Sequence, residues 1–226
     1  MLIAAIDTST IAVSVALADA DGLVARFDAP RLRRHAETVL PALDAVLTLA
    51  GRTRREITHI CVDVGPGMFT GLRVGVTTAI TLAMAFDLPV VSVGSLDVLA
   101  WRVALGGAHH GAIGAVIDAR RKECFVQPFT VTPGESPVPL GSVVATAPGA
   151  ASELLHQHGC LVVAGDGPAA YPEQFAGFTV LSPQHPDAAT AAIVALRTIE
   201  TATSADEVVL RYVREPDAEI PKDLRP

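Results

Sequence analysis

The order of the apolar segments along the first 105 residues restricts the fold more than any other feature of this sequence. Three short apolar runs separated by tight turns containing Asp and Gly are typical of an antiparallel meander. Behind the meander, segments with apolar residues at helical spacing alternate with short, continuously apolar runs that are typical of buried strands. The sequence therefore predicts strands at 2–8, 11–18, 23–28, 57–64 and 88–93, and helices at 38–50, 70–86 and 96–105.

A glycine-rich stretch at 106–111 precedes a second half in which this order returns in looser form. The repetition predicts an α/β protein of the duplicated actin-like (ASKHA, RNase H-like) type, with two lobes that each hold a mixed sheet and flanking helices. We expect the lobes at 1–105 and 106–226, with a tail from about 204 that wraps a lobe or stays mobile. A single doubly wound sheet is the alternative that the element order leaves open. The expected elements of the second half are strands at 112–118, 123–131 and 160–164, weak strands near Val138 and Val143, and helices at 149–158 and 186–201.

Composition narrows the class of protein. Half of the 226 residues are hydrophobic and only 18% are charged, which excludes a disordered chain and allows a sizeable core. The formal net charge of −7 disfavours extended nucleic-acid binding by the chain alone, because the phosphate backbone rewards clustered cations. Residues 26–55 nevertheless contain seven arginines and three acidic residues. This arginine-rich region either contacts RNA phosphates within an assembly or forms a solvated helix rim.

The spacing of the cysteines indicates whether the chain has a metal or disulfide framework, and the first residues indicate its cellular location. Cys61, Cys124 and Cys160 form no CxxC pair and no Cys/His finger, so we expect neither a metal framework nor a disulfide scaffold. The opening residues lack the positive start of a signal peptide, and no apolar run reaches the ~18 residues of a membrane span. We therefore expect a cytoplasmic protein without membrane association.

The stretch Gly65-Pro-Gly-Met-Phe-Thr-Gly-Leu-Arg-Val-Gly75 is the most informative motif. It fits neither the Walker A loop nor the dinucleotide-binding GxGxxG pattern. Small residues recur every four positions in the helix that follows, and such a ladder lets two helix backbones approach closely. The opposite side is also apolar, so the helix must be buried on most sides. We expect a partner chain to cover this ladder, with internal packing as the alternative. Its members are Gly71, Gly75, Ala79 and Ala83.

The polar residues at the end of the first strand are weak candidates for nucleotide contacts. Carboxylate and hydroxyl oxygens of Asp7, Thr8 and Ser9 suit a phosphate and its Mg²⁺, although a hydrogen-bonded turn that closes a hairpin explains the same residues. His35-Ala-Glu37 does not start an HExxH motif, because Val39 stands where the second histidine would be. No Ser/His/Asp or Cys/His set can be assembled, so we expect no catalytic residue and no metal ligand.

Several motifs together resemble the TsaB (YeaZ) family over the whole chain. They are Ile6-Asp-Thr-Ser-Thr, His35-Ala-Glu with the Leu-Pro that follows, the 65–75 stretch, Gly165-Asp-Gly167 and Arg211-Tyr-Val-Arg-Glu-Pro-Asp-Ala218. The resemblance implies a two-lobed actin-like fold and a non-catalytic scaffold subunit needed for threonylcarbamoyl transfer to adenosine 37 of tRNA. It implies as partners a catalytic TsaD-like paralogue, a TsaE-like ATPase and tRNA through the complex, and a homodimer when the chain is alone.

The resemblance also implies a pairing surface built from the helices at 38–50 and 70–86. The residues assigned to it are Leu40, Leu43, Leu47, Gly71, Gly75, Ala79 and Ala83. No cofactor is firmly implied, and ATP or ADP with Mg²⁺ is only a weak candidate ligand within the complex. The hairpin at 118–124 carries bulky charged side chains where actin-fold enzymes commonly place glycines at the phosphate, which disfavours ATP turnover by this chain alone. The alternatives are an independent ATP-dependent phosphotransferase and, more distantly, a metallopeptidase.

Overall fold

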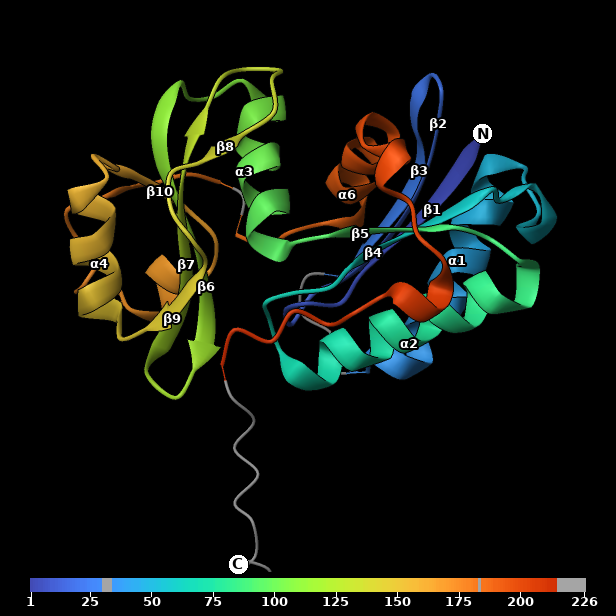
Figure 1. Cartoon of the computed structure of the whole chain (residues 1–226), viewed down its shortest axis with the longest axis horizontal. Helices are drawn as coiled ribbons and strands as arrows, with labels where there is room; N and C mark the ends of the chain where they lie inside the picture. Colours follow the sequence, from blue (N-terminus) through green and yellow to red (C-terminus); the bar gives the residue numbers. More distant parts are fainter. Residues whose placement is uncertain (30–33, 183, 215–226) are drawn as a thin grey trace, which may run out of the picture.

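Two separate β-sheets form the cores of two lobes that lie side by side (Figure 1). The structure is a computed structural model that describes residues 1–29, 34–182 and 184–214. Both lobes contain a mixed sheet with flanking helices, as the order of the apolar segments predicts. The alternative of one doubly wound sheet is wrong.

The first sheet joins the opening meander to two parallel strands. Its spatial order is β3-β2-β1-β4-β5. The central strand β1 pairs antiparallel with β2 and parallel with β4. Every residue of β1 is buried, because helices cover both faces of the sheet at this strand. The strands are β1 (Leu2–Asp7), β2 (Val13–Asp19), β3 (Gly22–Ala29), β4 (His59–Asp63) and β5 (Val90–Val93).

The helices α1 (His35–Ala50) and α2 (Phe69–Phe86) cover one face of this sheet, and α6 (Ala188–Arg197) covers the other. By length and composition α2 could cross a membrane. Its buried side nevertheless packs on β4 and β1, as expected for a core helix of an α/β lobe. The short 3-10 turn η1 (Arg54–Glu56) connects α1 to β4.

The second sheet has the order β11-β10-β6-β7-β8, and β9 also pairs with β7. Its centre is the long antiparallel hairpin of β6 and β7. Helix α4 (Pro148–Gln157) packs on β7, and the short α5 (Gly167–Ala170) packs on β6. The strands are β6 (Gly111–Arg120), β7 (Glu123–Val131), β8 (Val138–Pro139), β9 (Val144–Thr146), β10 (Val162–Ala164) and β11 (Thr179–Val180). The sequence did not predict α5 or β11.

Two helices pack across the expected division of the chain. Helix α3 (Ser95–Gly106), from the first half, packs on β6 and β7 of the second sheet. Helix α6, from the second half, packs on β1 and β2 of the first sheet, so the expectation that it completes the second lobe is wrong. All strands of each sheet lie on one side of residue 106, and a domain boundary at that point stays a prediction.

Helix α1 begins three residues earlier than expected. Thr38, at which the expected range begins, lies in the first turn, and its hydroxyl donates to the Arg34 carbonyl at 2.7 Å. Pro41 therefore lies in the second turn rather than the first. Its missing N–H leaves the Glu37 carbonyl without a helical donor, which is tolerated because this side of the helix faces solvent.

The chain end crosses from one lobe to the other. After the 3-10 turn η2 (Ile199–Thr201), residues 203–214 form a segment that we call the strap, which includes the turn η3 (Ala205–Glu207). The η3 turn packs on α2, the Arg211 N–H donates to the Val64 carbonyl at 2.8 Å, and Arg214 reaches the second lobe (Figure 1). The strap thus wraps both lobes, and the rest of the expected tail, 215–226, lies outside the described residues.

Candidate functional site

Two buried carboxylates lie at one edge of the first sheet. Asp7 ends β1 and Asp63 ends β4, and the carboxyl ends of these parallel neighbours meet. The Ser9 N–H and hydroxyl each donate to Asp7 Oδ1 at 2.8 Å. The Gly65 N–H and the Ser95 hydroxyl donate to Asp63 Oδ1 at 2.7 Å. The Oδ2 atom of each aspartate has no hydrogen-bond partner among the described residues.

Burial changes the acidity of both groups. Each aspartate is only 2% exposed. Desolvation raises the pKa of Asp7 to about 6, and hydrogen bonds from Ser9 oppose this effect. Desolvation and the nearby Asp7 charge raise the pKa of Asp63 well above its ordinary value. The pair therefore favours a protonated state over two desolvated charges.

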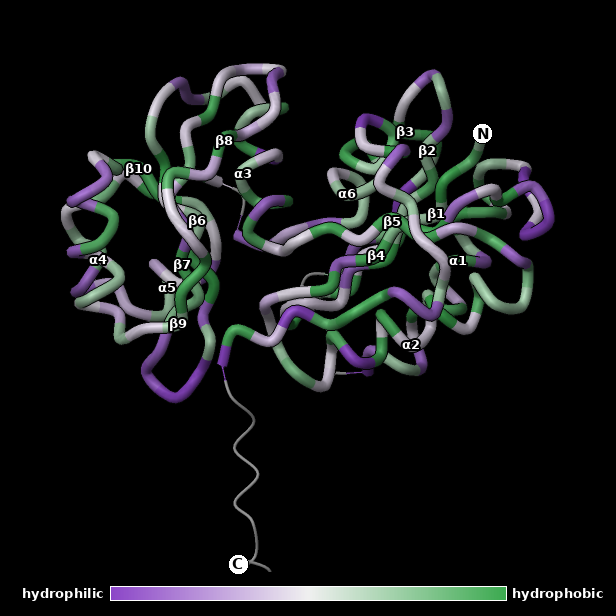
Figure 2. The backbone as a smooth tube through the Cα atoms, viewed as in Figure 1, coloured by the Kyte–Doolittle hydropathy of each residue, from purple (hydrophilic) through white to green (hydrophobic). Residues whose placement is uncertain are grey.

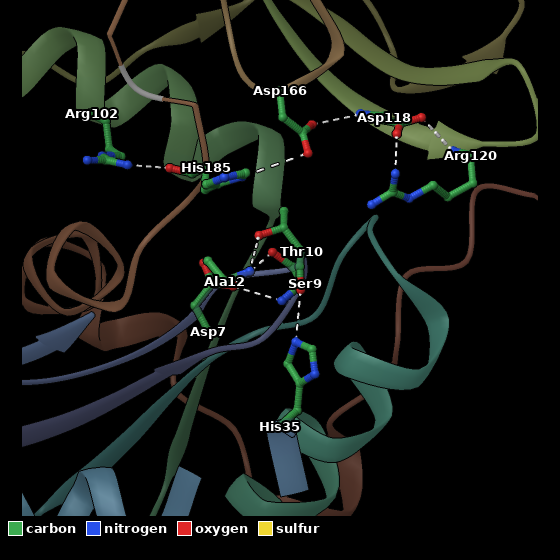
Figure 3. Close-up of polar contacts among 10 residues, drawn as sticks. All are labelled: Asp7, Ser9, Thr10, Ala12, His35, Arg102, Asp118, Arg120, Asp166 and His185. Atoms are coloured by element: carbon green, nitrogen blue, oxygen red, sulfur yellow. Dashed lines mark hydrogen bonds and ion pairs between the residues drawn. The ribbon is translucent and has the colours of Figure 1, made fainter. Parts of the chain in front are cut away.

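A second polar cluster faces this edge from the other lobe (Figure 3). Asp118, near the end of β6, donates its backbone N–H to Asp166 Oδ1 at 2.8 Å. Its Oδ1 accepts the Arg120 N–H at 2.8 Å and the Tyr171 hydroxyl at 3.0 Å. Burial raises the pKa of Asp166 to about 6. The turn Gly165-Asp-Gly167 thus holds the β6–β7 hairpin next to its tip.

Residues of α3 and of the segment before α6 extend the second cluster to helix α6. His185 Nδ1 lies 3.8 Å from Asp166 Oδ2, and Arg102 donates to the His185 carbonyl (Figure 3). Arg102 also pairs with Asp187 at 3.0 Å. Asp187 in turn caps α6 by accepting the Thr190 N–H at 2.7 Å. The polar groups between the lobes therefore form one chain of contacts that runs from Asp166 to the start of α6.

The structure brings Asp7, Thr8 and Ser9 together but buries them. Each is at most 2% exposed, and the Thr8 hydroxyl donates to the Gly71 carbonyl at 2.8 Å. The Ser9 N–H bond to Asp7 is the hydrogen-bonded turn that the sequence offered as an alternative. His35 Nε2, 3.0 Å from the Thr10 carbonyl, ties α1 to the same turn. Nucleotide contact by these residues stays a prediction.

A resident metal does not fit these residues. The two orphaned Oδ2 atoms of Asp7 and Asp63 would suit a hard cation, but such an ion takes several oxygen ligands. Among the residues that the structure describes, no group of three or more His, Cys, Asp and Glu side chains could hold a metal ion.

The small-residue ladder of α2 faces its own lobe. A Cβ atom on Gly71 would lie 2.2 Å from the Thr8 carbonyl oxygen, and one on Gly75 would lie 2.3 Å from the Thr8 hydroxyl oxygen. Ala79 and Ala83 are buried in the same lobe. The close approach that the spacing predicts is thus real, but it brings α2 onto the tip of β1 and not onto another chain. The first lobe thus buries all four residues in the isolated chain, and their placement on a partner-facing surface stays a prediction.

The three leucines assigned to the pairing surface differ in their exposure to solvent. Leu43 and Leu47 are buried in the first lobe, and only Leu40 reaches the surface, with 41% exposure. The exposed side of α2 carries a different stripe, which sequence reasoning missed although its steps of four and three residues are those of one helix side. Its members are Phe69, Arg73, Thr77, Thr81 and Met84.

Most described members of the arginine-rich region pair with carboxylates. Arg54 pairs with Asp44 at 2.6 Å, and Arg52 contacts both Asp19 and Glu56. Arg26 pairs with Asp28. These pairs favour the solvated-rim interpretation, while the arginines at 31 and 33 lie outside the described residues.

Sequence reasoning also missed Asp63, Arg102 and His185 as members of the site. Asp63 has one usable signal, because it closes a buried run directly before a glycine-rich turn. Arg102 and His185 carry none, since they are 83 positions apart and meet only when α3 and the segment before α6 pack together.

Comparison with known proteins identifies the fold first. EutJ, an ethanolamine utilization protein from Carboxydothermus hydrogenoformans, superposes with a TM-score of 0.50 at 13% identity, over 87% of this chain and 89% of that chain. A Pseudomonas aeruginosa protein described as similar to peptidase YEAZ superposes with a TM-score of 0.79 at 26% identity, over 94% of this chain and 99% of that chain. The chain is therefore a two-lobed protein of the actin-like ASKHA class.

Sequence comparison then shows which proteins the chain resembles. TsaB of Bacillus subtilis is 36% identical over 55% of this chain and 53% of its own length, and TsaB of Escherichia coli is 38% identical over 55% and 53%. The Mycobacterium leprae protein ML0378, described as uncharacterized, is 31% identical over 96% of this chain and 56% of its own length. A family model described as "TsaD: tRNA N6-adenosine threonylcarbamoyltransferase" matches residues 29–136. The chain is therefore similar to the TsaB (YeaZ) proteins, and it spans about half the length of the curated relatives it matches.

Proposed function

We propose that this chain acts in the formation of threonylcarbamoyladenosine on tRNA as a non-catalytic scaffold or activator subunit of a TsaD-like transferase. The observation that carries the proposal is the 36% and 38% identity to two proteins named for the biosynthesis of this nucleoside. The family-model match, whose description names the transfer reaction itself, supports the same process.

The polar site favours an accessory role over independent phosphotransfer. A kinase needs open phosphate contacts, whereas the hydroxyls of Thr8 and Ser9 are buried and bonded internally. The hairpin tip opposite them carries Arg120, Arg121 and Lys122 instead of glycines. ATP or ADP with Mg²⁺ therefore enters our proposal only as a ligand of the assembled complex, and the chain itself works in the cytoplasm.

The TsaD-like partner docks on the exposed sides of α1 and of the second half of α2, from Thr77 onward. Leu40 and Leu49 of α1 are 41% and 76% exposed, and Met84 of α2 is 70% exposed. Exposed apolar side chains on two neighbouring helices are typical of surfaces that another protein covers. A TsaE-like ATPase and tRNA join this pair, and the chain forms a homodimer through the same helices when it is alone.

A bulky substitution on the exposed stripe tests the partner surface. Thr77 is exposed at the middle of α2, so Thr77→Trp adds bulk outside the lobe and leaves the fold intact. We expect this variant to lose co-purification with the TsaD-like protein and to lose modification of tRNA in a mixture containing the TsaE-like protein, the threonylcarbamoyl donor and ATP. Glu153→Trp, on the exposed side of α4 in the second lobe, is the matched control and retains both. Normal association of the folded Thr77→Trp protein would refute the assignment.

A further inference from the structure

Aromatic rings and an arginine form an exposed cluster where α2 meets the strap. The Arg73 guanidinium lies 3.9 Å from the centre of the Phe69 ring, and Arg73 Nε donates to the Tyr212 hydroxyl at 3.3 Å. The Phe69 and Tyr212 ring centres are 5.7 Å apart. Both rings are nearly half exposed, at 48% and 47%. Rings that remain this exposed while an arginine orders them offer flat surfaces for stacking.

The tip of the β6–β7 hairpin presents three consecutive cations in an unfavourable backbone conformation. Arg120, Arg121 and Lys122 have φ angles of 64°, 55° and 63°, in the left-handed region that favours glycine. Three cationic side chains thus occupy positions where glycine would fold more easily. Strain of this kind persists where a function requires the side chains. Figure 2 shows this tip as a strongly hydrophilic end of the second sheet.

The strap joins the ring cluster to the cationic tip. Arg214, two residues beyond Tyr212, pairs with Glu123 at 2.9 Å and donates to the Ala119 carbonyl at 3.3 Å. Figure 1 shows the strap passing between the start of α2 and this hairpin. We call the continuous surface formed by these residues the strap surface. Its members are Phe69, Arg73 and Tyr212 on one side and Arg120, Arg121, Lys122 and Arg214 on the other.

The strap surface is positive on a chain that is negative as a whole. With Arg211, which pairs with Asp97 at 3.5 Å, it contains six cationic side chains. Arg120 pairs with Asp118, Arg211 with Asp97 and Arg214 with Glu123. The net charge of the whole chain is −7, so the local excess of positive charge marks this side of the molecule.

We infer that the strap surface binds a single-stranded segment of RNA, with bases stacked on the Phe69–Tyr212 cluster and phosphates on the Arg120–Lys122 tip. This inference rests on the proposed function, which makes an RNA the substrate of the assembly. Alternating rings and cations suit unpaired nucleotides, because each base offers a face and each linkage a negative charge. A protein partner fits less well, since protein interfaces are depleted in lysine and in charged residues at their centre.

Fluorescence anisotropy with the full-length chain tests the inference. The probe is a fluorescein-labelled RNA stem-loop, compared at low salt with the same strand annealed to its complement. We expect tighter binding to the loop form. Phe69→Ala and Tyr212→Ala should weaken it about 5-fold to 100-fold, the loss typical of one stacked base. Lys122→Gln should weaken binding and lower the slope of log affinity against log salt by ~0.7.

Two controls separate the alternatives. Arg55→Gln removes one exposed cation from the arginine-rich region, and it should bind the stem-loop as the unaltered chain does. Tyr212→Phe keeps the ring and should retain binding. Equal affinity of the unaltered chain, Tyr212→Ala and Lys122→Gln would overturn the inference. Loss of the TsaD-like partner by Phe69→Ala with unchanged RNA affinity would also overturn it, in favour of a protein interface.

Different results would refute the RNA-binding inference and the proposed function. A chain that supports modification but does not bind the stem-loop, alone or in the complex, retains the proposed function and loses this inference. A chain that binds the stem-loop through these residues but never supports modification retains this inference and loses the proposed function.

Discussion

Replacing Gly71 with alanine should destabilise the folded chain, because the ladder of α2 packs inside the first lobe. The new Cβ would lie 2.2 Å from the Thr8 carbonyl oxygen. That oxygen belongs to the backbone next to β1 and cannot turn away as a flexible side chain could. Overpacking of this kind costs ~3 kcal/mol, and the better helix propensity of alanine returns ~1 kcal/mol. The net loss of about 2 kcal/mol should lower the Tm by ~4–8 °C for a chain of this size.

Thermal unfolding followed by circular dichroism measures this loss. Gly149→Ala is the matched control, since Gly149 lies in α4 and a Cβ added there would meet no atom within 4 Å. It should keep or raise the Tm, by at most ~1 kcal/mol of added stability. A Gly71→Ala protein as stable as the unaltered chain would refute inward packing and would return the ladder to the partner-facing surface.

Three further outcomes follow from the site and the strap. Because burial raises the pKa of Asp7 from 3.8 to about 6, the stability that its protonated form contributes is complete below pH ~4 and is lost as the pH rises through ~6. Asp7→Asn should therefore make the free energy of unfolding, measured with urea, nearly independent of pH between these two values. It should also raise that free energy by up to ~2–3 kcal/mol at pH 7. A pH dependence equal to that of the unaltered chain would contradict the raised pKa of Asp7. Arg214→Ala removes the contacts to Ala119 and Glu123, so hydrogen exchange at the β6–β7 tip should accelerate while exchange in β1 stays slow. Exchange at that tip as slow as in the unaltered chain would contradict the strap's role. Pro41→Ala restores a donor to the Glu37 carbonyl in the second turn of α1 and should raise the Tm; a lower Tm would show that proline shapes this turn.

The sequence predicts most strands of the first sheet well because they are apolar runs bounded by turns, whereas the mostly exposed β3 is recognised by the Asp/Gly turn before it. Leu2–Asp7 and Val13–Asp19 are buried along almost their whole length, so their composition reports their position in the core. It does not predict which sheet α3 and α6 cover. Periodicity identifies the apolar side of a helix, but any sheet can receive that side.

The ladder shows a related limit. The four-residue spacing from Gly71 to Ala83 correctly indicates that a backbone approaches α2 closely. The spacing does not indicate which backbone approaches α2. In the structure it is that of Thr8, 63 positions before Gly71. The carboxylate pair is similar, because Asp7 and Asp63 meet only through the parallel pairing of β1 and β4. Contacts set by strand order are therefore invisible in local motifs.

The proposed role requires this chain to promote threonylcarbamoyl transfer without performing it. The most direct measurement is the rate of threonylcarbamoyladenosine formation as this chain is titrated into fixed amounts of the TsaD-like protein, the TsaE-like protein, tRNA, threonylcarbamoyl donor and ATP, with the nucleoside quantified by mass spectrometry. We expect a rate that rises with added chain, saturates at a fixed ratio to the TsaD-like protein, and is zero when that protein is omitted. Product formed in its absence, or a rate indifferent to this chain, would contradict the proposed role.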